Sequence, residues 1–454
     1  MITHSVIQKS QLEGAHRLDA DYYQPEYLDL EKKLDSVETK TIDEISKSVV
    51  SFGAYSLTSY IEWQESGIPY INVGDIHGGY IDTSNIKHIS EKVDEILKKS
   101  RVNNGQVLLT MAGTIGNAAV AYNLSRPMNA NQAIAKIMPI DDISPYYLAA
   151  FLNSKYGKLQ TQREIVSSVQ ANIFLGQIKK FKVPFFGKGK TTKVESIYRD
   201  FLDTLEHSQS LYSQAESLLL EELGLKNFKA DEDLYSVVNF SDIRTANRMD
   251  AEYFQPKYER LISVLRAQKA RPLADVLENV PAKFNPLAQP DKAFKYVELS
   301  NINGSIGIID GYTETSGREA PGRAKRILKK GDVVVSTVEG SLGKVALVHK
   351  EQEGCLASTG FFQFRSEDLL PEVLLVIAKS FIFYNQLEQR CAGTILTAVP
   401  KDSIRDILVP ILPKVTQEKI AELVRESHAA RKKARELLEE AKRKVEELIE
   451  SKAS

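Results

Sequence analysis

The sequence has little cysteine, no long apolar run and no excess of charge. Its 454 residues include two cysteines, Cys355 and Cys391, which are too few for a disulfide framework and too far apart for a zinc knuckle. A reducing cytoplasm is therefore expected. The apolar run 369–378 is interrupted by Pro371 and Glu372, and the first residues lack a basic and apolar leader, so neither a membrane span nor a signal peptide is expected. The formal charge of −1 argues against a non-specific polyanion binder, although a local groove can still be basic.

Signatures of catalysis are also missing from the sequence. An adenine methyltransferase would show Asp or Asn followed by Pro-Pro and an aromatic residue, whereas the nearest string, 285–287, reads Asn-Pro-Leu. The segment 187–191 resembles the end of a phosphate-binding loop, but the glycine required before it is replaced by Pro184. The seven histidines show no metal-ligand spacing. The sequence therefore predicts a chain without a metal, a cofactor or catalytic residues of its own.

What the sequence does contain is a large internal repeat. The stretch 17–27 returns almost unchanged at 248–258: each copy starts with an arginine, continues with Asp-Ala, and reaches two aromatic residues before Gln-Pro. Asp19 and Asp250 are 231 positions apart, far beyond the periods of about 20 to 50 residues that mark solenoids. The repeated unit must therefore be a whole domain. Each copy also predicts a lead-in helix, because a proline at the first turn is followed by apolar residues at helical spacing.

Both halves then alternate between short strand-like runs and turns, which predicts a mixed α/β domain. The runs Tyr70–Val73 and Val107–Leu109 correspond to Tyr296–Leu299 and Val333–Val335. The expected fold class is α+β, with two pseudo-symmetric α/β domains joined by two long antiparallel coiled-coil helices. The expected segments are a lead-in segment 1–40, a domain 41–188, a central helix 189–225, a linker with the second lead-in helix 226–266, a domain 267–413 and a C-terminal helix 414–454.

Each domain precedes a long helical stretch, 192–223 or 416–448, with an approximately heptad apolar stripe and no internal proline or glycine. Ser208 interrupts the first stripe. The first stretch is mainly acidic, whereas the second carries the basic run 431–435, and the sequence leaves open whether this run pairs with the other helix or faces solvent. At about 1.5 Å per residue each helix would be about 50 Å long.

A glycine-rich turn in each domain is the first candidate contact site. The turn glycines flank a hydroxyl residue, Thr114 in one copy and Ser341 in the other, with Asn117 or Lys344 just beyond. Small residues let backbone N–H groups approach a phosphate or a base edge, although a plain structural turn is the simpler explanation of the pattern. The candidate contact residues of these two elements are Thr110, Thr114, Asn117, Ser336, Ser341 and Lys344.

Further candidates follow in both copies. Asn131 and Gln132 carry amides suited to a bidentate contact with adenine, and the second copy has Ser358 and Thr359 in the same frame. A binding scaffold with two specificities would diverge in this way. Polar stretches later in each copy are loops or ligand contacts, and lysines flank the first long helix and the end of the second domain. These remaining candidates are Ser167, Gln170, Asn172, Lys188, Lys190, Thr397 and Lys401.

Two variable α/β domains, each followed by a long helix and each containing a Gly-hydroxyl-aliphatic-Gly turn (113–116 and 340–343), resemble the specificity subunits of type I restriction-modification systems. The resemblance covers almost the whole chain. It implies that each domain reads one part of a split double-stranded DNA target and that the candidate residues above contact DNA. It also implies that the helices dock two methyltransferase subunits, which perform the catalysis, and it leaves open whether two restriction subunits also join. Ala112 and Val338, before the turn glycines, depart from the polar residues expected there.

The aromatic pairs of the repeated segment, Tyr22 with Tyr23 and Tyr253 with Phe254, are candidate contacts for the methyltransferase subunits, because aromatic residues beside a charged rim often anchor protein partners. Burial of each pair against its own domain is the alternative. For the whole chain, two other functions are considered: an adaptor whose duplicated domains bind protein rather than DNA, and a methyltransferase without recognisable motifs.

Overall fold

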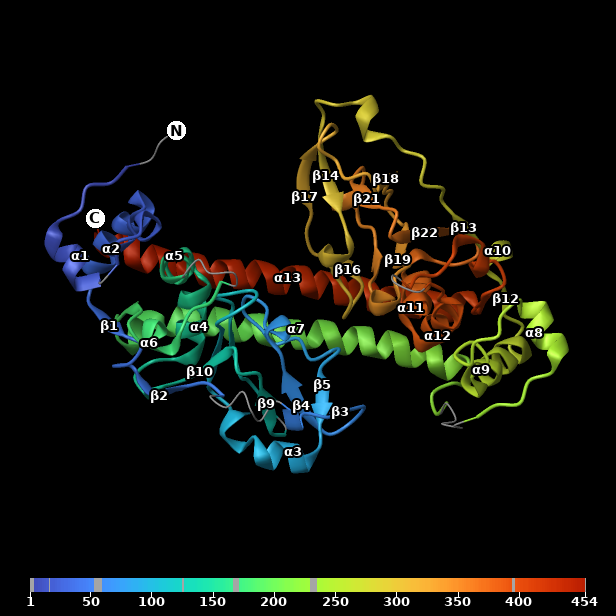
Figure 1. Ribbon diagram of the computed structural model, residues 1–454, viewed down its shortest axis with the longest axis horizontal. Coiled ribbons are helices and arrows are strands. Elements are labelled where there is room, and N and C mark those ends of the chain that lie inside the picture. Colours follow the sequence, from blue (N-terminus) through green and yellow to red (C-terminus); the bar gives the residue numbers. More distant parts are fainter. Residues whose placement is uncertain are drawn as a thin grey trace. The chain divides into compact units, whose positions relative to one another are not determined.

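The computed structural model describes residues 4–15, 17–52, 59–124, 126–165, 171–228, 235–393 and 397–453 (Figure 1). The chain forms two compact units. Unit 1 comprises Met1–Leu205 and Lys432–Ser454, and unit 2 comprises Glu206–Arg431. Each unit therefore contains one globular part and one segment from each of two long helices.

Unit 1 contains a four-stranded sheet in the order β2-β10-β7-β8, a five-stranded sheet in the order β3-β5-β4-β9-β6, and the pair β1-β11. Its short helices are α1 (Lys9–Ala15), α2 (Pro25–Asp35), α3 (Glu91–Ile96), α4 (Pro145–Asn153), α5 (Lys155–Glu164) and α6 (Leu175–Ile178). Its strands are β1 (Thr39–Thr41), β2 (Ser46–Val50), β3 (Trp63–Gln64), β4 (Ile68–Ile71), β5 (Lys87–Ile89), β6 (Arg101–Val102), β7 (Val107–Thr110), β8 (Ala118–Val120), β9 (Met128–Ala130), β10 (Ile134–Pro139) and β11 (Lys182–Pro184).

Unit 2 repeats this plan with the sheets β13-β22-β19-β20 and β17-β14-β21-β18 and the pairs β12-β23 and β15-β16. Its short helices are α8 (Phe240–Ala246), α9 (Pro256–Ala267), α10 (Leu273–Val276), α11 (Pro371–Lys379) and α12 (Phe381–Arg390). Its strands are β12 (Arg271–Pro272), β13 (Leu277–Asn279), β14 (Ala293–Val297), β15 (Ile302–Asn303), β16 (Ile308–Ile309), β17 (Thr313–Ser316), β18 (Ala324–Ile327), β19 (Val333–Ser336), β20 (Val345–Leu347), β21 (Leu356–Ser358), β22 (Phe361–Ser366) and β23 (Leu408–Val409).

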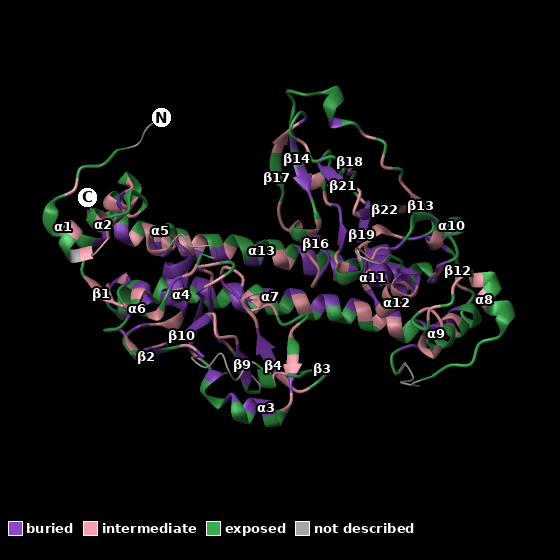
Figure 2. Cartoon of the chain, viewed as in Figure 1, coloured by how far each residue is buried: buried purple, intermediate pink, exposed green. Residues whose placement is uncertain are grey.

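The strands β7 and β19 of the inner sheets are buried along their whole length, because both of their faces are covered (Figure 2). In β7, Val107 and Leu109 belong to the core shared with the helices, whereas Leu108 belongs to a second core on the opposite face. Val333 and Val335 of β19 face the helices, and Val334 faces the opposite core, in the same way. Alternate side chains of a strand point to opposite faces, so one uninterrupted apolar run supplies two cores. The predicted duplication of an α/β domain is confirmed.

The two predicted long helices are present as α7 (Lys188–Glu222) and α13 (Lys414–Ala453). In unit 2 they run antiparallel: Thr416, near the start of α13, donates a hydrogen bond to Glu222 at the end of α7. In unit 1 the other ends share one buried core, in which Phe201 of α7 lies with Leu438 of α13. The antiparallel pairing predicted from the two stripes is confirmed.

The interruption of the stripe at Ser208 has a structural reason. Ser208 and Ser427 are both fully buried, and each hydroxyl donates to the backbone carbonyl of the other residue, at 2.8 and 2.7 Å. Small side chains allow the two helix backbones to approach closely enough for this reciprocal arrangement. The polar position therefore joins the helices and does not mark a gap between them.

We expect Ser208→Ala and Ser427→Ala each to lower the free energy of unfolding by about 1 kcal/mol, the usual net value of one hydrogen bond. Because each hydroxyl binds a backbone carbonyl that the other substitution leaves in place, the two losses should add. Chemical denaturation measures the free energy of unfolding of the wild type, both single variants and the double variant, which together form a double-mutant cycle. A double variant that loses no more than either single variant would contradict the reciprocal geometry.

A second polar contact joins α13 to the globular part of unit 2. Nε2 of His349 lies 2.9 Å from Nδ1 of His428, and Nε2 of His428 lies 2.8 Å from the carbonyl oxygen of Ile306. The carbonyl can only accept, so the His428 Nε2 carries the proton and its Nδ1 accepts from His349. The His428 imidazole is neutral in this arrangement. Burial lowers the pKa of His428 to about 4.

This lowered pKa predicts acid sensitivity in unit 2. The unfolded chain protonates His428 near pH 6.5, whereas the folded chain resists protonation down to about pH 4, so the folded state binds fewer protons between these values. Stability should be complete above about pH 6.5 and should fall by about 3 kcal/mol as the pH approaches 4. Around His428, His349 and Lys379 act in the same direction as burial, and Glu372 opposes it.

Denaturation of His428→Gln as a function of pH measures this contribution. The variant should lose the part of the acid sensitivity that arises between pH 6.5 and 4. The matched control is His207→Gln, since His207 is exposed on the same helix pair. Equal pH dependence of the wild type and His428→Gln would contradict the prediction.

The segment 226–247, expected as a linker, contains one regular element among its described residues, the helix α8. Asn239 begins it with a capping box to Asp242, and Asn247 ends it in a left-handed conformation. Both capping residues are visible in the sequence, but the high content of Asp, Asn and Lys in this segment favoured the prediction of a linker. None of the described helices is long and apolar enough to cross a membrane.

Candidate nucleic-acid interface

The glycine-rich turn of unit 1 connects β7 to β8. Gly113 and Gly116 have φ of 65° and 82°, a left-handed conformation that favours glycine. Thr110 is fully buried, and its Oγ1 accepts a hydrogen bond from the Asn117 N–H at 2.9 Å. Thr114 is exposed on the turn. Of the hydroxyls in this turn, Thr110 braces the backbone and Thr114 faces solvent.

Lys158, a half-buried residue outside the predicted contact set, supports the same turn. Nζ of Lys158, on α5, donates to the carbonyl of Gly116 at 2.7 Å and to Oδ1 of Asn117 at 2.8 Å. The Asn117 amide in turn donates to the carbonyl of Ile76 at 3.2 Å. Burial lowers the pKa of Lys158 to about 8. Asn117 therefore has both ends of its amide engaged, and nothing in the local sequence around Lys158 signals this role.

The corresponding turn of unit 2 contains the short 3-10 helix Glu339–Ser341. Ser336 is fully buried, lies 3.0 Å from the hydroxyl of Ser341, and accepts a hydrogen bond from the Val338 N–H. Nζ of Lys344 donates to the carbonyl of Ile302 at 2.8 Å. Ser341 and Lys344 are half-buried. The second turn is thus braced by side chains as the first one is, with different residues.

In each unit, three of the candidate segments lie side by side. They are held together by backbone hydrogen bonds to the residue that follows β7 or β19. In unit 1 the Met111 N–H donates to the carbonyl of Ala133, and the Met111 carbonyl accepts from Ile173. These contacts join the turn to the Asn131 and Gln132 segment and to Asn172. In unit 2 Thr337 makes the equivalent contacts with Gly360 and Val399. The structure therefore groups residues that are far apart in the sequence.

The side chains at the two equivalent loops differ in exposure as well as in kind. Asn131 is half-buried, and its Oδ1 accepts from the Ala133 N–H at 2.8 Å. Gln132 is half-buried with no hydrogen bond to its Oε1. Ser358 is buried and accepts from the Gly360 N–H, whereas Thr359 is half-exposed. Asn131, Gln132 and Thr359 are therefore the partly exposed residues of these two loops.

The remaining candidates are distributed more widely. Thr397 is half-buried, and its carbonyl accepts from the Glu339 N–H at 3.1 Å, while Lys401 is exposed. Lys190 is exposed in the first turn of α7, which begins at Lys188, and belongs to none of the three converging segments. Two further candidates, Ser167 and Gln170, lie outside the described residues.

The repeated segment forms the same local structure in each unit. Arg17 pairs with Asp19 through two hydrogen bonds of 2.6 Å, and its guanidinium lies 4.8 Å from the centre of the Tyr22 ring. Arg163 of α5 donates to the Tyr22 carbonyl. Tyr23 is 4% exposed, and its hydroxyl donates to the Arg17 carbonyl. The repeated sequence thus connects the start of each half to its own α/β domain.

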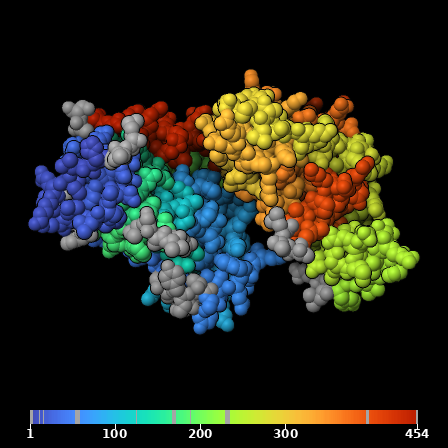
Figure 3. All heavy atoms as spheres, turned by 45° about the horizontal axis from the view of Figure 1, so that its top comes forward, coloured from blue at the N-terminus to red at the C-terminus, as the bar shows by residue number. Residues whose placement is uncertain are grey.

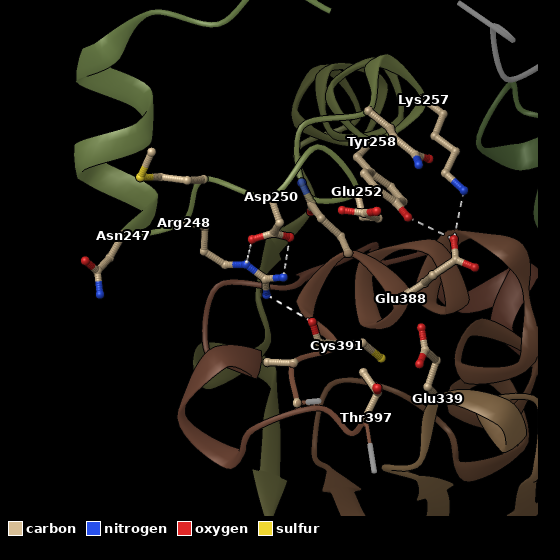
Figure 4. A pocket seen from close by; sticks show the side chains of 15 residues that line it. Asn247, Arg248, Asp250, Glu252, Lys257, Tyr258, Glu339, Glu388, Cys391 and Thr397 are labelled. Atoms are coloured by element: carbon tan, nitrogen blue, oxygen red, sulfur yellow. Dashed lines mark hydrogen bonds and ion pairs between the residues drawn. The ribbon is translucent and has the colours of Figure 1, made fainter. Parts of the chain in front are cut away.

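In unit 2, Arg248 pairs with Asp250 and also donates to the Cys391 carbonyl (Figure 4). Gln389 of α12 donates to the Tyr253 carbonyl, as Arg163 does to Tyr22. Tyr253 and Phe254 are half-buried. Tyr23 is therefore buried against its own domain, as the alternative prediction has it. Tyr22, Tyr253 and Phe254 remain partly exposed to solvent.

A recess of about 780 Å³ lies beside this segment in unit 2 (Figure 4). Lys257 and Tyr258 both donate to Oε2 of Glu388 on its wall, at 2.8 and 2.9 Å. Glu339 and Thr397 also line it, so the recess connects the repeated segment with the glycine-rich turn. Unit 1 has a smaller recess of about 420 Å³.

Comparison with known proteins gives a consistent set of relatives. Residues 35–206 match the family model for the type I restriction modification DNA specificity domain. The HindI specificity subunit of Haemophilus influenzae is 23% identical over 168 residues, 34% of this chain and 33% of the relative. The EcoBI specificity subunit of Escherichia coli is 32% identical over 91 residues, 20% of this chain and 19% of the relative. The matches thus span a third or less of these curated relatives.

Solved structures give the same set of proteins. The crystal structure of the type I restriction-modification S subunit from M. genitalium is similar with 13% identity and a TM-score of 0.41, over 90% of this chain and 95% of that one. The HsdS subunit from Thermoanaerobacter tengcongensis has 11% identity and a TM-score of 0.29, over 91% and 96%. Residues 35–206 are thus similar to a type I restriction modification DNA specificity domain, and the second half of the chain repeats the strand order of the inner sheet of this domain.

Proposed function

We propose that the chain is the DNA-recognition subunit of a type I restriction-modification complex. The observation that supports this most is the repeated frame with different side chains: Asn131 and Gln132 in unit 1 take the place of Ser358 and Thr359 in unit 2. The same backbone contacts hold both loops beside the central strand. A duplicated scaffold with divergent polar side chains suits a bipartite, asymmetric target, because the major groove distinguishes base pairs by their donors and acceptors.

In this proposal the recognition domains are 41–188 and 267–413, and each reads one half of the target. The helices and the repeated segment, with Tyr22, Tyr253 and Phe254, dock two methyltransferase subunits, whereas Tyr23 is buried in its own domain. Adenine methylation, and DNA cleavage where restriction subunits are present, belong to those partners in the cytoplasm. The specificity subunit itself binds double-stranded DNA and needs no cofactor. The partly open aromatic side chains beside Arg17 and Arg248 support this docking surface.

The test is sequencing of adenine methylation in cells with and without the gene, in the presence of its methyltransferase partner. We expect two short specified stretches separated by unspecified bases, and their loss when the gene is removed. A contiguous methylated target would contradict the two-domain assignment.

A protein-binding adaptor is the second candidate, favoured by the net charge of −1 and by the half-exposed aromatic pairs. Salt distinguishes the two functions, since DNA binding should weaken steeply as the salt concentration rises through counterion release. An adaptor would show no DNA binding at any salt concentration.

A further inference from the structure

One segment of unit 2 is strongly basic although the whole chain is nearly neutral. Residues 281–330 contain nine Lys and Arg but five Asp and Glu, a net charge of +4. The corresponding segment of the first half, 55–104, contains five Lys and Arg but seven Asp and Glu, a net charge of −2. The basic segment carries β14, β17 and β18 of the outer sheet (Figure 1) and forms a broad part of the surface, yellow to orange in Figure 3. The duplicated fold therefore carries opposite local charges in its two copies.

Three exposed cations of this segment gather around β18. Lys325 lies on β18, Arg323 precedes it, and Lys283 lies on the neighbouring loop, which is joined to the strand by the hydrogen bond from the Phe284 N–H to the Lys325 carbonyl at 3.0 Å. The Arg323 carbonyl accepts from the Thr359 N–H at 2.8 Å. We name Lys283, Arg323 and Lys325 the β18 rim. Its backbone is thus attached directly to the half-exposed candidate base contact of unit 2.

The cations of the β18 rim have no ion-pair partner among the described residues, whereas three carboxylates of the same segment are engaged with other groups. Asp291 pairs with Arg318 at 3.0 Å, and Glu319 accepts from the Ser316 hydroxyl at 2.9 Å. Asp310 pairs with Arg431 of α13 at 3.3 Å. The rim charges are therefore available to an external anion.

In unit 1, the arginine on the equivalent edge strand is paired with carboxylates. Arg101 of β6 lies 2.7 Å from Asp94 and 2.6 Å from Glu95, so its charge is neutralised within the unit. Strand β6 has the same place in its sheet that β18 has in the sheet of unit 2, at the edge beside β9 or β21. Lys99, just before β6, is exposed as Lys325 is, but the β6 edge has no counterpart of Arg323, because position 97 is a buried leucine. The edge of unit 2 therefore carries more free cations than the described part of the same edge in unit 1.

We propose that the β18 rim binds DNA phosphates next to the half-site read by the second domain, and that it gives the second domain the larger share of the electrostatic attraction to DNA. This inference rests on the proposed function. Phosphate contacts set the position of a protein on the duplex without reading sequence. In this arrangement the β18 rim binds a phosphate of the DNA backbone, and Thr359 faces a neighbouring base. A chain with a net charge of −1 can hold a polyanion because several free cations lie together at this edge.

The test measures binding of the full chain to a fluorescent duplex of mixed sequence, about 40 base pairs long, over a series of salt concentrations. The variant Lys283→Ala/Arg323→Ala/Lys325→Ala should bind more weakly at low salt. Each lost phosphate contact lowers the slope of log affinity against log salt by about 0.9, so the slope should fall by about 2 to 3. The charge-conserving variant Arg323→Lys/Lys325→Arg should keep the wild-type slope.

The matched control is Lys92→Ala/Lys98→Ala/Lys99→Ala, which removes the same charge from exposed lysines in and next to α3 of unit 1. It should leave the slope close to that of the wild type. Equal losses in both triple variants would overturn the inference, because net charge alone would then explain binding. An unchanged slope in the rim variant would also overturn it while leaving DNA recognition standing. A wild type that binds no duplex at low salt would overturn the proposed function itself.

Discussion

Replacing Asn131 and Gln132 with alanine is expected to relax the first half of the methylated target while leaving the second half intact. A well-placed bidentate amide contact discriminates against the wrong base by about 1 to 3 kcal/mol, which corresponds to a preference of about 5-fold to 150-fold. The Oε1 of Gln132 is buried without a hydrogen-bond partner among the described residues, so turning this oxygen toward a base breaks no hydrogen bond within that part of the chain. Sequencing of adenine methylation with the double variant and its partner measures the effect.

The matched variant changes Ser358 and Thr359 to alanine and should relax the second half only. Thr359 is the half-exposed member of this pair, so Thr359→Ala alone should account for most of the change. Ser358→Ala is the internal control, because this side chain is buried and accepts a hydrogen bond from its own loop. If either double variant relaxed both halves equally, the assignment of one domain to one half of the target would be wrong.

The second large effect is expected from Gly116→Ala in the turn of unit 1. A Cβ at this position would lie 2.7 Å from Cγ2 of Thr161, and the φ of 82° is itself unfavourable for alanine. The two costs together should lower the free energy of unfolding by about 3 kcal/mol. For a unit of this size that corresponds to a fall in melting temperature of roughly 6 to 12 °C, measured by calorimetry.

Two controls separate the causes of this loss. Gly105 has a similar φ of 84° but no atom within 4 Å of its added Cβ, so Gly105→Ala should show the conformational cost alone, about 1 kcal/mol. Thr161→Ser removes the clashing methyl group and keeps the hydroxyl that donates to the Gly157 carbonyl, so it should restore part of the stability of Gly116→Ala. Equal destabilisation by the Gly116 and Gly105 substitutions would show that contact with Thr161 is unimportant.

The element types were predictable because their causes are local. Pro25 and Pro256 begin the predicted lead-in helices α2 and α9, and the apolar runs at 107–109 and 333–335 became central strands. The apolar stripes of the two long helices predicted their pairing, because a stripe of this length must be buried against a partner. Ser208 could not be interpreted in the same way, since its hydrogen-bond partner is 219 residues away.

The candidate site was less predictable from the sequence. Thr110, Ser336 and Ser358 have the hydroxyls that suit a DNA contact, yet the fold places all three inside, where they satisfy backbone groups of their own loops. Local sequence does not distinguish a hydroxyl that braces a turn from one that faces a ligand. Burial does, and burial depends on packing between distant segments.

By itself the sequence determined that this chain is a duplicated α/β protein with two long paired helices, because repeats, apolar periodicity and turn residues act over short distances. Only the tertiary structure decided which polar residues reach the surface, how Lys158 came to support the turn from another helix, and which cations remain unpaired. Arg101 is neutralised by Asp94 and Glu95, whereas Arg323 and Lys325 at the equivalent edge have no carboxylate partner in the described part of the chain. The physical reason is that pairing and burial of a charge depend on residues brought together by folding.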